Sequence, residues 1–222
     1  VTIFLRMDEY RERVIINKDN IRPVGEEPNR TVITWNACAK DLDAEGNEKG
    51  TFLSWTVIVS GTNVSIENLT IRNDAGDGHL VGQAVALYAA GERFACRNTK
   101  LIAHQDTLFC GPVITKTAKD ALPYALPDQV ESAGDCPPVF IRQYFENCYI
   151  QGDTDYIFGS ASVWFEGCEL FMNELAKSQR DAIDAYAEEH REAFRRSNSV
   201  VARLDPLPSG GYEAVLSLLD AT

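Results

Sequence analysis

Four short segments of the chain share one pattern of apolar, polar and turn positions. Each has an apolar or Cys residue, an Asn or Gly two positions later, and an aliphatic residue five positions after the first. The segments cover residues 64–71, 94–101, 143–150 and 163–170. Because Asn and Gly tolerate a left-handed backbone, the pattern predicts a bend at a fixed point in each short strand. The bends are expected at Asn68, Asn98, Asn147 and Gly167.

The spacing of these units is irregular. They begin at residues 64, 94, 143 and 163, so that successive units are between 20 and 49 residues apart. Short strands at such intervals are typical of a β-solenoid, in which insertions loop out between stacked coils. A β-sandwich is the alternative, but it more often shows hairpin turns every 8–12 residues or so. The chain has no such series of turns, and we expect an all-β solenoid.

Two regions depart from this rhythm. Five of the nine prolines fall between Gly111 and Pro138, which indicates an exposed inserted loop. From residue 173 to 196, apolar residues recur every three or four positions between charged ones, which predicts an amphipathic helix. A shorter helix is expected over residues 214–219. The prediction is therefore a β-helix over residues 1–172 and a helical tail over 173–222, which covers the open edge and apolar core of the last coil.

The composition limits the classes of partner that we expect. The formal net charge is -12, which repels nucleic acid and anionic membranes, so neither is expected as a partner. A free polyanion would be repelled as well, whereas an acidic polymer masked by esterification would not. No apolar run approaches the ~20 residues that span a bilayer.

The six cysteines contain no CxxC pair, and we expect no zinc site. Cys110 and Cys136 flank the proline-rich loop and are candidates for a disulfide that closes it. The other cysteines are interpreted as small core residues.

Two aspartates occupy the same phase of the repeat. Asp106 follows Cys96 by ten residues, and Asp155 follows Phe145 by ten. In neighbouring coils, equal phase would place the two carboxyls on one face, about one strand spacing (~4.8 Å) apart. One pKa should then be raised above the other, an arrangement that supplies a nucleophile and a general acid together. The alternative is that each Asp only serves a turn.

These residues lie in motifs that resemble those of pectin methylesterases. Residues 82–87 read GQAVAL and residues 105–108 read QDTL, as in that family, and residues 155–159 read DYIFG, similar to its DFIFG motif. Weaker similarity covers residues 142–145 and 10–12, and the resemblance extends from about residue 3 to about residue 171. It implies a right-handed parallel β-helix that hydrolyses the galacturonate methyl esters of pectin and releases methanol, without metal or organic cofactor.

The resemblance also assigns roles by position. Asp155 would be the nucleophile and Asp106 the general acid and base, while Gln105 and Gln83 would donate hydrogen bonds to the oxyanion. Three aromatic residues are candidates for sugar contacts: Phe109, Tyr156 and Trp164. Trp164 precedes the inward-phase Phe165 and should therefore point outward. We expect a monomeric protein, and the resemblance suggests an extracellular location.

The family's GRPW motif, whose arginine orients the nucleophile, has no match in this chain. The arginines of the corresponding region, at positions 180, 191, 195 and 196, are not followed by Pro-Trp. We therefore expect a weakly active or inactive esterase, and the alternative is a non-catalytic pectin-binding β-helix. An inverting glycosidase is disfavoured because its carboxyls stand ~6.5–9.5 Å apart. A serine hydrolase is disfavoured because no GxSxG motif is present.

Overall fold

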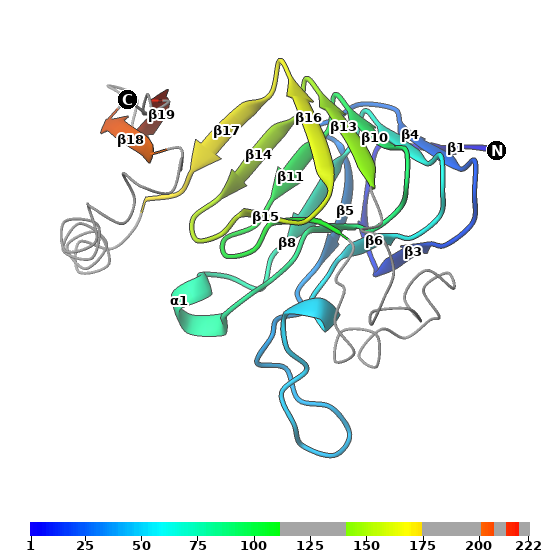
Figure 1. Cartoon of the computed structure of the whole chain (residues 1–222). Helices are drawn as coiled ribbons and strands as arrows, with labels where there is room; N and C mark the ends of the chain where they lie inside the picture. The colour runs from blue at the N-terminus through cyan, green and yellow to red at the C-terminus, as the bar shows by residue number, and fades with distance from the viewer. Residues whose placement is uncertain (112–140, 175–200, 207–211, 218–222) are drawn as a thin grey trace, which may run out of the picture. The chain divides into compact units, whose positions relative to one another are not determined.

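The computed structural model describes residues 1–111, 141–174, 201–206 and 212–217. The chain divides into two compact units, Val1–Glu169 and Leu170–Thr222. The first unit is a parallel β-helix whose strands follow one another around three sheets (Figure 1). The predicted all-β solenoid is confirmed.

Each turn of the solenoid, here called a coil, contributes one strand to each of sheets A, B and C in that order. Sheet A contains β1 (Thr2–Leu5), β4 (Arg22–Gly25), β7 (Ser65–Glu67), β10 (Phe94–Arg97), β13 (Arg142–Glu146) and β16 (Ser162–Glu166). Sheet B contains, in the first unit, β2 (Asp8–Arg11), β5 (Thr31–Trp35), β8 (Thr70–Asn73), β11 (Lys100–Ile102) and β14 (Tyr149–Gly152). Sheet C contains β3 (Val14–Ile16), β6 (Val57–Val59), β9 (Leu87–Ala89), β12 (Leu108–Cys110) and β15 (Ile157–Gly159). The next strand along the chain, β17 (Glu169–Met172), begins at the last residue of the first unit.

The strand registers follow the sequence repeat. In sheet A, Cys96 stands opposite Ile66 on one side and Phe145 on the other. In sheet B, Leu101 stands opposite Ile71 and Ile150. These are the first and last apolar positions of each repeat unit. Residues that are equivalent in the sequence repeat are therefore neighbours on adjacent coils.

The bends between sheets A and B have the backbone that the repeat predicts. Asn68, Asn98 and Asn147 have φ values of 59°, 47° and 51°, and Gly167 has 60°. The Asn68 side chain also ties two coils together, because its Nδ2 donates to the carbonyl oxygen of Gly25 at 2.7 Å. Asn68 therefore both adopts the left-handed backbone of the bend and links its coil to the preceding one.

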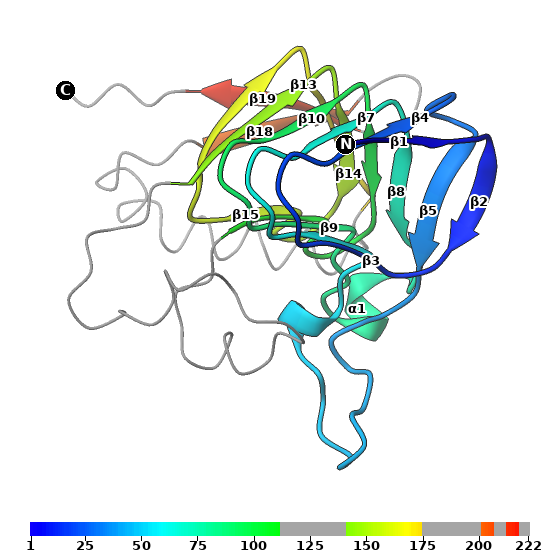
Figure 2. The ribbon, with the colours of Figure 1, turned by 90° about the vertical axis from the view of Figure 1, so that its right-hand side faces the viewer.

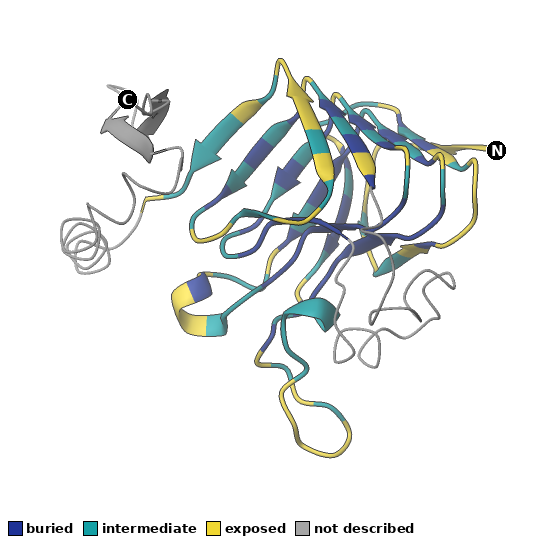
Figure 3. Ribbon diagram, in the orientation of Figure 1, coloured by how far each residue is buried: buried dark blue, intermediate teal, exposed yellow. Residues whose placement is uncertain are grey.

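The buried residues that form the core lie along the strands of all three sheets (Figure 3). Ile66, Cys96 and Phe145 from sheet A are at most 1% exposed, and so are Ile71, Leu101 and Ile150 from sheet B. Stacking identical positions of successive coils buries apolar side chains in continuous rows, which is how short strands gain stability in a solenoid.

Two insertions leave the coils next to sheet C. Residues 36–56 contain the short 3₁₀ helix η1 (Thr51–Leu53), and residues 74–86 contain α1 (Gly78–Val81). Figures 1 and 2 show both insertions extending from the same side of the solenoid. Among the described residues, no helix is long and apolar enough to cross a membrane.

The second unit corrects one prediction. Residues Val201–Pro206 (β18) and Tyr212–Ser217 (β19) form an antiparallel pair, so the helix expected over residues 214–219 is wrong. A short apolar run can form either a helix or a strand. Here the backbone groups of β19 form hydrogen bonds with the neighbouring segment β18, which favours the strand. The longer helix expected over residues 173–196 lies almost entirely outside the described residues, and the cap remains a prediction.

Gly159, at the end of β15, offers a test of the coil packing. Its φ is +131°, and a Cβ added there would collide with the Cys110 carbonyl of the neighbouring coil. We expect Gly159→Ala to lower the free energy of unfolding by about 3 kcal/mol or more. Gly46→Ala is the matched control, because Gly46 also has positive φ (+86°) but open space around its Cα. Urea unfolding should show a loss of only about 1 kcal/mol for the control, and equal losses would refute the collision.

Candidate active site

Asp106 and Asp155 lie at the corner between sheets B and C, on successive coils. Before the corner Lys100 stands opposite Tyr149, and after it Leu108 stands opposite Ile157. The offset is 49 residues on both sides, which places Asp106 opposite Asp155. Both aspartates have left-handed backbone, with φ of 65° and 47°. Asp is among the residues that tolerate this conformation, so these residues also form the bend.

The two carboxyls have different surroundings. Asp106 is 6% exposed, whereas Asp155 is exposed to solvent. Burial raises the pKa of Asp106 to about 7, and the charges of Asp155 and then Asp153 add to the effect. A buried carboxyl that is still partly protonated near neutral pH thus stands beside an accessible one, an arrangement suited to acid–base chemistry.

A histidine–aspartate pair stands next to the two aspartates. His104 Nδ1 lies 3.1 Å from Asp153 Oδ2, and this hydrogen bond raises the pKa of His104. The two residues are again 49 positions apart, so the repeat offset that identifies Asp106 and Asp155 also relates this pair. Neither residue indicates a role on its own in the sequence, and only the offset between them reveals the pair.

Gln105 and Gln83 are both half-buried and lie on adjacent coils. The amide nitrogen of Ala84, next to Gln83, donates to the Gln105 carbonyl oxygen at 3.0 Å. Gly78 of α1 packs against Gln105, because a Cβ at Gly78 would meet the Gln105 Cβ. Both glutamines therefore lie near the corner that carries the aspartates, and their hydrogen-bond roles toward a substrate remain a prediction.

The three aromatic candidates lie in different places. Tyr156 directly follows Asp155 and is half-buried. Trp164 is 67% exposed and points outward as predicted, but it belongs to sheet A, whereas the aspartates lie at the B–C corner. Alternation along a strand predicts which residues point outward, but not which sheet forms the wall of a groove.

Phe109 is covered. It is 3% exposed and packs with Tyr88 and Phe158 in a row on the outer face of sheet C, with ring centroids 4.5 and 4.9 Å away. Phe52 from the 36–56 insertion closes over it at 5.6 Å. The structure therefore gives Phe109 a packing role and leaves no open ring face for a sugar. Phe158, three residues after Asp155, is half-buried in the same row.

Within the described ranges, no group of three or more His, Cys, Asp or Glu side chains is arranged to hold a metal ion. The proposed disulfide partner of Cys110, Cys136, lies outside the described residues. Cys110 itself is a buried free thiol whose pKa is raised to about 12 by burial.

The fold and the site together define a class of protein. It is a parallel β-helix in which adjacent coils carry one buried and one exposed carboxyl at the same corner. The family model described as Pectinesterase matches residues 1–112 and 138–201 of the chain. The chain belongs to the pectinesterase family.

Individual relatives agree with this assignment. Pectinesterase 31 of Arabidopsis thaliana is 30% identical over 167 residues, which is 72% of this chain and 43% of that protein. The pectin methylesterase from Yersinia enterocolitica superposes with a TM-score of 0.63 at 29% identity, over 79% of this chain and 51% of that one. A pectin methylesterase solved in complex with a hexasaccharide gives 0.62 at 28% identity, over 79% and 47%. The chain spans about a quarter to a half of the length of the curated relatives it matches.

The His104–Asp153 pair should influence the pKa of Asp106, although burial and Asp155 contribute more to its shift. Asp153→Asn removes a negative charge that raises the pKa of Asp106, and we expect that pKa to fall. His104→Gln removes the cation that offsets Asp153, and at pH values where His104 is protonated the pKa of Asp106 should rise. Carboxyl-carbon NMR titration of the two variants would measure both shifts. Shifts in the same direction would contradict the pairing.

Proposed function

We propose that this chain hydrolyses the galacturonate methyl esters of pectin, at a low rate, with Asp155 as nucleophile and Asp106 as general acid and base. The observation that carries the proposal is the pairing of an exposed carboxyl with a buried one of pKa about 7, in register on adjacent coils. Membership of the pectinesterase family supports the reaction class.

In the proposed mechanism a carboxylate oxygen of Asp155 attacks the ester carbonyl carbon, and negative charge develops on the carbonyl oxygen. Gln105 and Gln83 donate hydrogen bonds to that oxygen. Asp106, protonated in the resting state, gives its proton to the departing methoxide, which leaves as methanol. The resulting acyl–Asp155 intermediate is then hydrolysed by a water molecule that Asp106 deprotonates, which restores both carboxyls.

The different surroundings of Asp106 and Asp155 suit their proposed roles as general acid and nucleophile. A general acid is most effective when its pKa lies near the working pH, and burial holds Asp106 there. The nucleophile must be accessible to a polymer, and Asp155 is exposed. Phe158 and Tyr156 adjoin this corner and are the aromatic residues we propose for contact with the sugar rings.

The experiment is methanol release from highly esterified pectin by the 222-residue chain at high protein concentration. Asp155→Asn serves as the background, since Asn tolerates the left-handed backbone of this position. Release above the background supports the proposal. Release equal to the background, together with pectin binding in calorimetry, would overturn hydrolysis and favour a non-catalytic pectin-binding β-helix.

Gln105→Ala should leave part of the activity. One oxyanion donor is worth roughly 10²–10³ in rate, so kcat should fall by about that factor while KM changes little. A kcat equal to that of the parent would show that Gln105 does not contact the oxyanion. Thermal unfolding of the variant separates this result from a packing defect against α1.

A further inference from the structure

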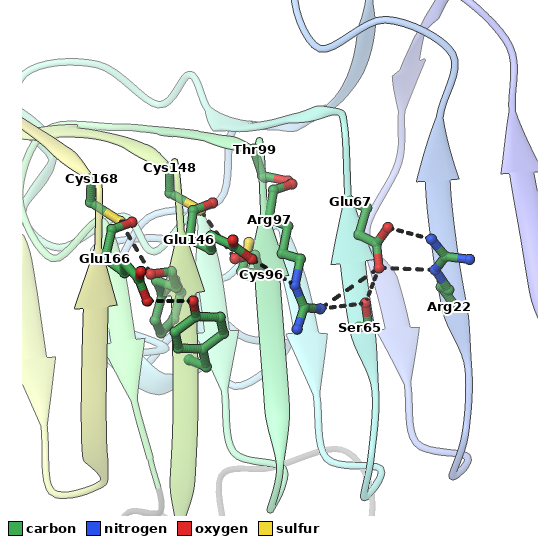
Figure 4. A network of polar contacts seen from close by, with 12 residues as sticks. Arg22, Ser65, Glu67, Cys96, Arg97, Thr99, Glu146, Cys148, Glu166 and Cys168 are labelled. Atoms are coloured by element: carbon green, nitrogen blue, oxygen red, sulfur yellow. Dashed lines mark hydrogen bonds and ion pairs between the residues drawn. The ribbon is translucent and has the colours of Figure 1, made fainter.

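Three cysteine side chains gather at the corner between sheets A and B, away from the aspartates. Cys96 lies in β10, Cys148 follows the bend residue Asn147, and Cys168 follows the bend residue Gly167 (Figure 4). All three are free thiols. The sequence predicts that they are core residues, and the alignment of the coils also brings Cys148 and Cys168 side by side.

Cys148 and Cys168 occupy equivalent positions on adjacent coils. Phe145 stands opposite Phe165 and Glu146 opposite Glu166, so two residues further on Cys148 faces Cys168. The amide nitrogen of Glu169 donates to the Cys148 carbonyl oxygen at 2.9 Å, which holds the two strands together at this point. Parallel strands are about 4.7–4.9 Å apart, within the ~4.4–6.8 Å between Cα atoms that a disulfide spans.

The side chains point the same way. Cys148 Sγ lies 3.4 Å from the Cys96 carbonyl oxygen, and Cys168 Sγ lies 3.4 Å from the carbonyl oxygen of Phe145, the residue in register with Cys96. Each thiol therefore reaches back toward the preceding coil. Cys168 reaches toward the coil that carries Cys148. Joining the two sulfurs requires side-chain rotation and a small approach of the two strands, because a disulfide holds its Cβ atoms about 3.5–4.5 Å apart.

The three thiols differ in access. Cys96 and Cys148 are at most 1% exposed, whereas Cys168 is partly exposed. A hydrogen bond from Cys96 lowers the pKa of Cys148, while burial raises the pKa of Cys96 and that of Cys168. A dissolved oxidant can thus reach Cys168 first, and Cys148 is the neighbour best able to attack as a thiolate.

We propose that Cys148 and Cys168 form a reversible disulfide when the protein meets a low-molecular-weight disulfide such as oxidised glutathione. The Cys168 thiolate attacks one glutathione sulfur and releases one glutathione thiolate, which leaves a mixed disulfide. The Cys148 thiolate then attacks Cys168 Sγ and releases the second glutathione. Two protein thiols lose two protons and two electrons, and the oxidised glutathione is reduced to two molecules of glutathione.

The bond would close a loop of about 20 residues that contains the B–C corner of its coil, β15 and β16. Because a cross-link restricts the unfolded chain, oxidation should raise the melting temperature by about 5–10 °C. This inference does not depend on esterase activity, since the cysteines lie at a different corner from Asp106 and Asp155.

The test is mass spectrometry and thermal unfolding of the full chain after incubation with oxidised or reduced glutathione. No Lys or Arg lies between the two cysteines, so trypsin leaves both in one peptide. A protease that cuts after Asp and Glu separates them at Asp153, Asp155 and Glu166. We expect a linked pair of peptides containing Cys148 and Cys168, the higher melting temperature, and reversal of both by dithiothreitol.

Two serine variants sharpen the result. Cys168→Ser should abolish both the link and the shift in melting temperature, whereas Cys110→Ser should retain them, because Cys110 is buried in sheet C. Peptides linked through Cys96, or thiols that stay reduced while the fold is intact, would overturn the proposal. Because mapping of the unaltered chain identifies the link directly, a variant that fails to fold does not decide the outcome.

Discussion

Replacing Asp155 by Asn is expected to reduce methanol release by at least about 10⁴-fold, because the proposed reaction begins with attack by this carboxylate and an amide cannot replace it. The substitution should leave the fold intact. The side chain is exposed, and Asn tolerates the φ of 47° that Asp155 adopts. The measurement is initial-rate methanol release, with circular dichroism to verify folding.

Asp153→Asn is the matched control. It removes a carboxylate only two residues away, on the same coil, but one that bonds His104. We expect its activity to remain within about tenfold of the parent, with any change arising from the pKa of Asp106. If Asp153→Asn and Asp155→Asn were equally inactive, the assignment of Asp155 as the nucleophile would lose its support.

The features that the sequence predicts well are those set by the repeat. A bend residue recurs where a left-handed backbone is needed, so the positions of Asn98 and Asn147 within the repeat are enough to indicate the corner between sheets A and B. Phase within the coil then relates distant residues. The same offset that aligns Cys96 with Phe145 places Asp106 opposite Asp155.

The features that escape sequence interpretation depend on what covers a position. Phe109 occupies an outward-pointing place in β12, yet Phe52 from an insertion closes over it. Alternation along a strand carries no information about a loop that originates two coils earlier. Trp164 is a different case: alternation predicts its outward direction, and its phase within the repeat already places it before the A–B bend, away from the aspartates. The His104–Asp153 pair follows the repeat offset, so the phase rule applied to every polar residue at the corner would find it.

Asp106→Asn is expected to stabilise the fold at high pH while abolishing the general acid. Asp106 has a folded-state pKa of about 7 against an ordinary value of 3.8. The raised pKa means that the folded state binds the proton more tightly than the unfolded state. Its favourable contribution is complete below about pH 3.8 and is lost as pH rises through about 7.

Above about pH 7 the folded protein must hold a buried, 6% exposed carboxylate beside Asp155, a cost of about 3–5 kcal/mol for a shift of this size. Asn carries no charge and tolerates the φ of 65°. At about pH 8 the free energy of unfolding of the variant should therefore be about 3 kcal/mol larger than that of the parent. At about pH 4 the two free energies of unfolding should nearly coincide. Urea unfolding at the two pH values measures both differences. Asp106→Ala shares the loss of charge but strains the left-handed backbone, so it should show the same pH dependence with a constant offset. A parent protein whose stability does not fall between these two pH values relative to both variants would mean that Asp106 is not held protonated by its burial.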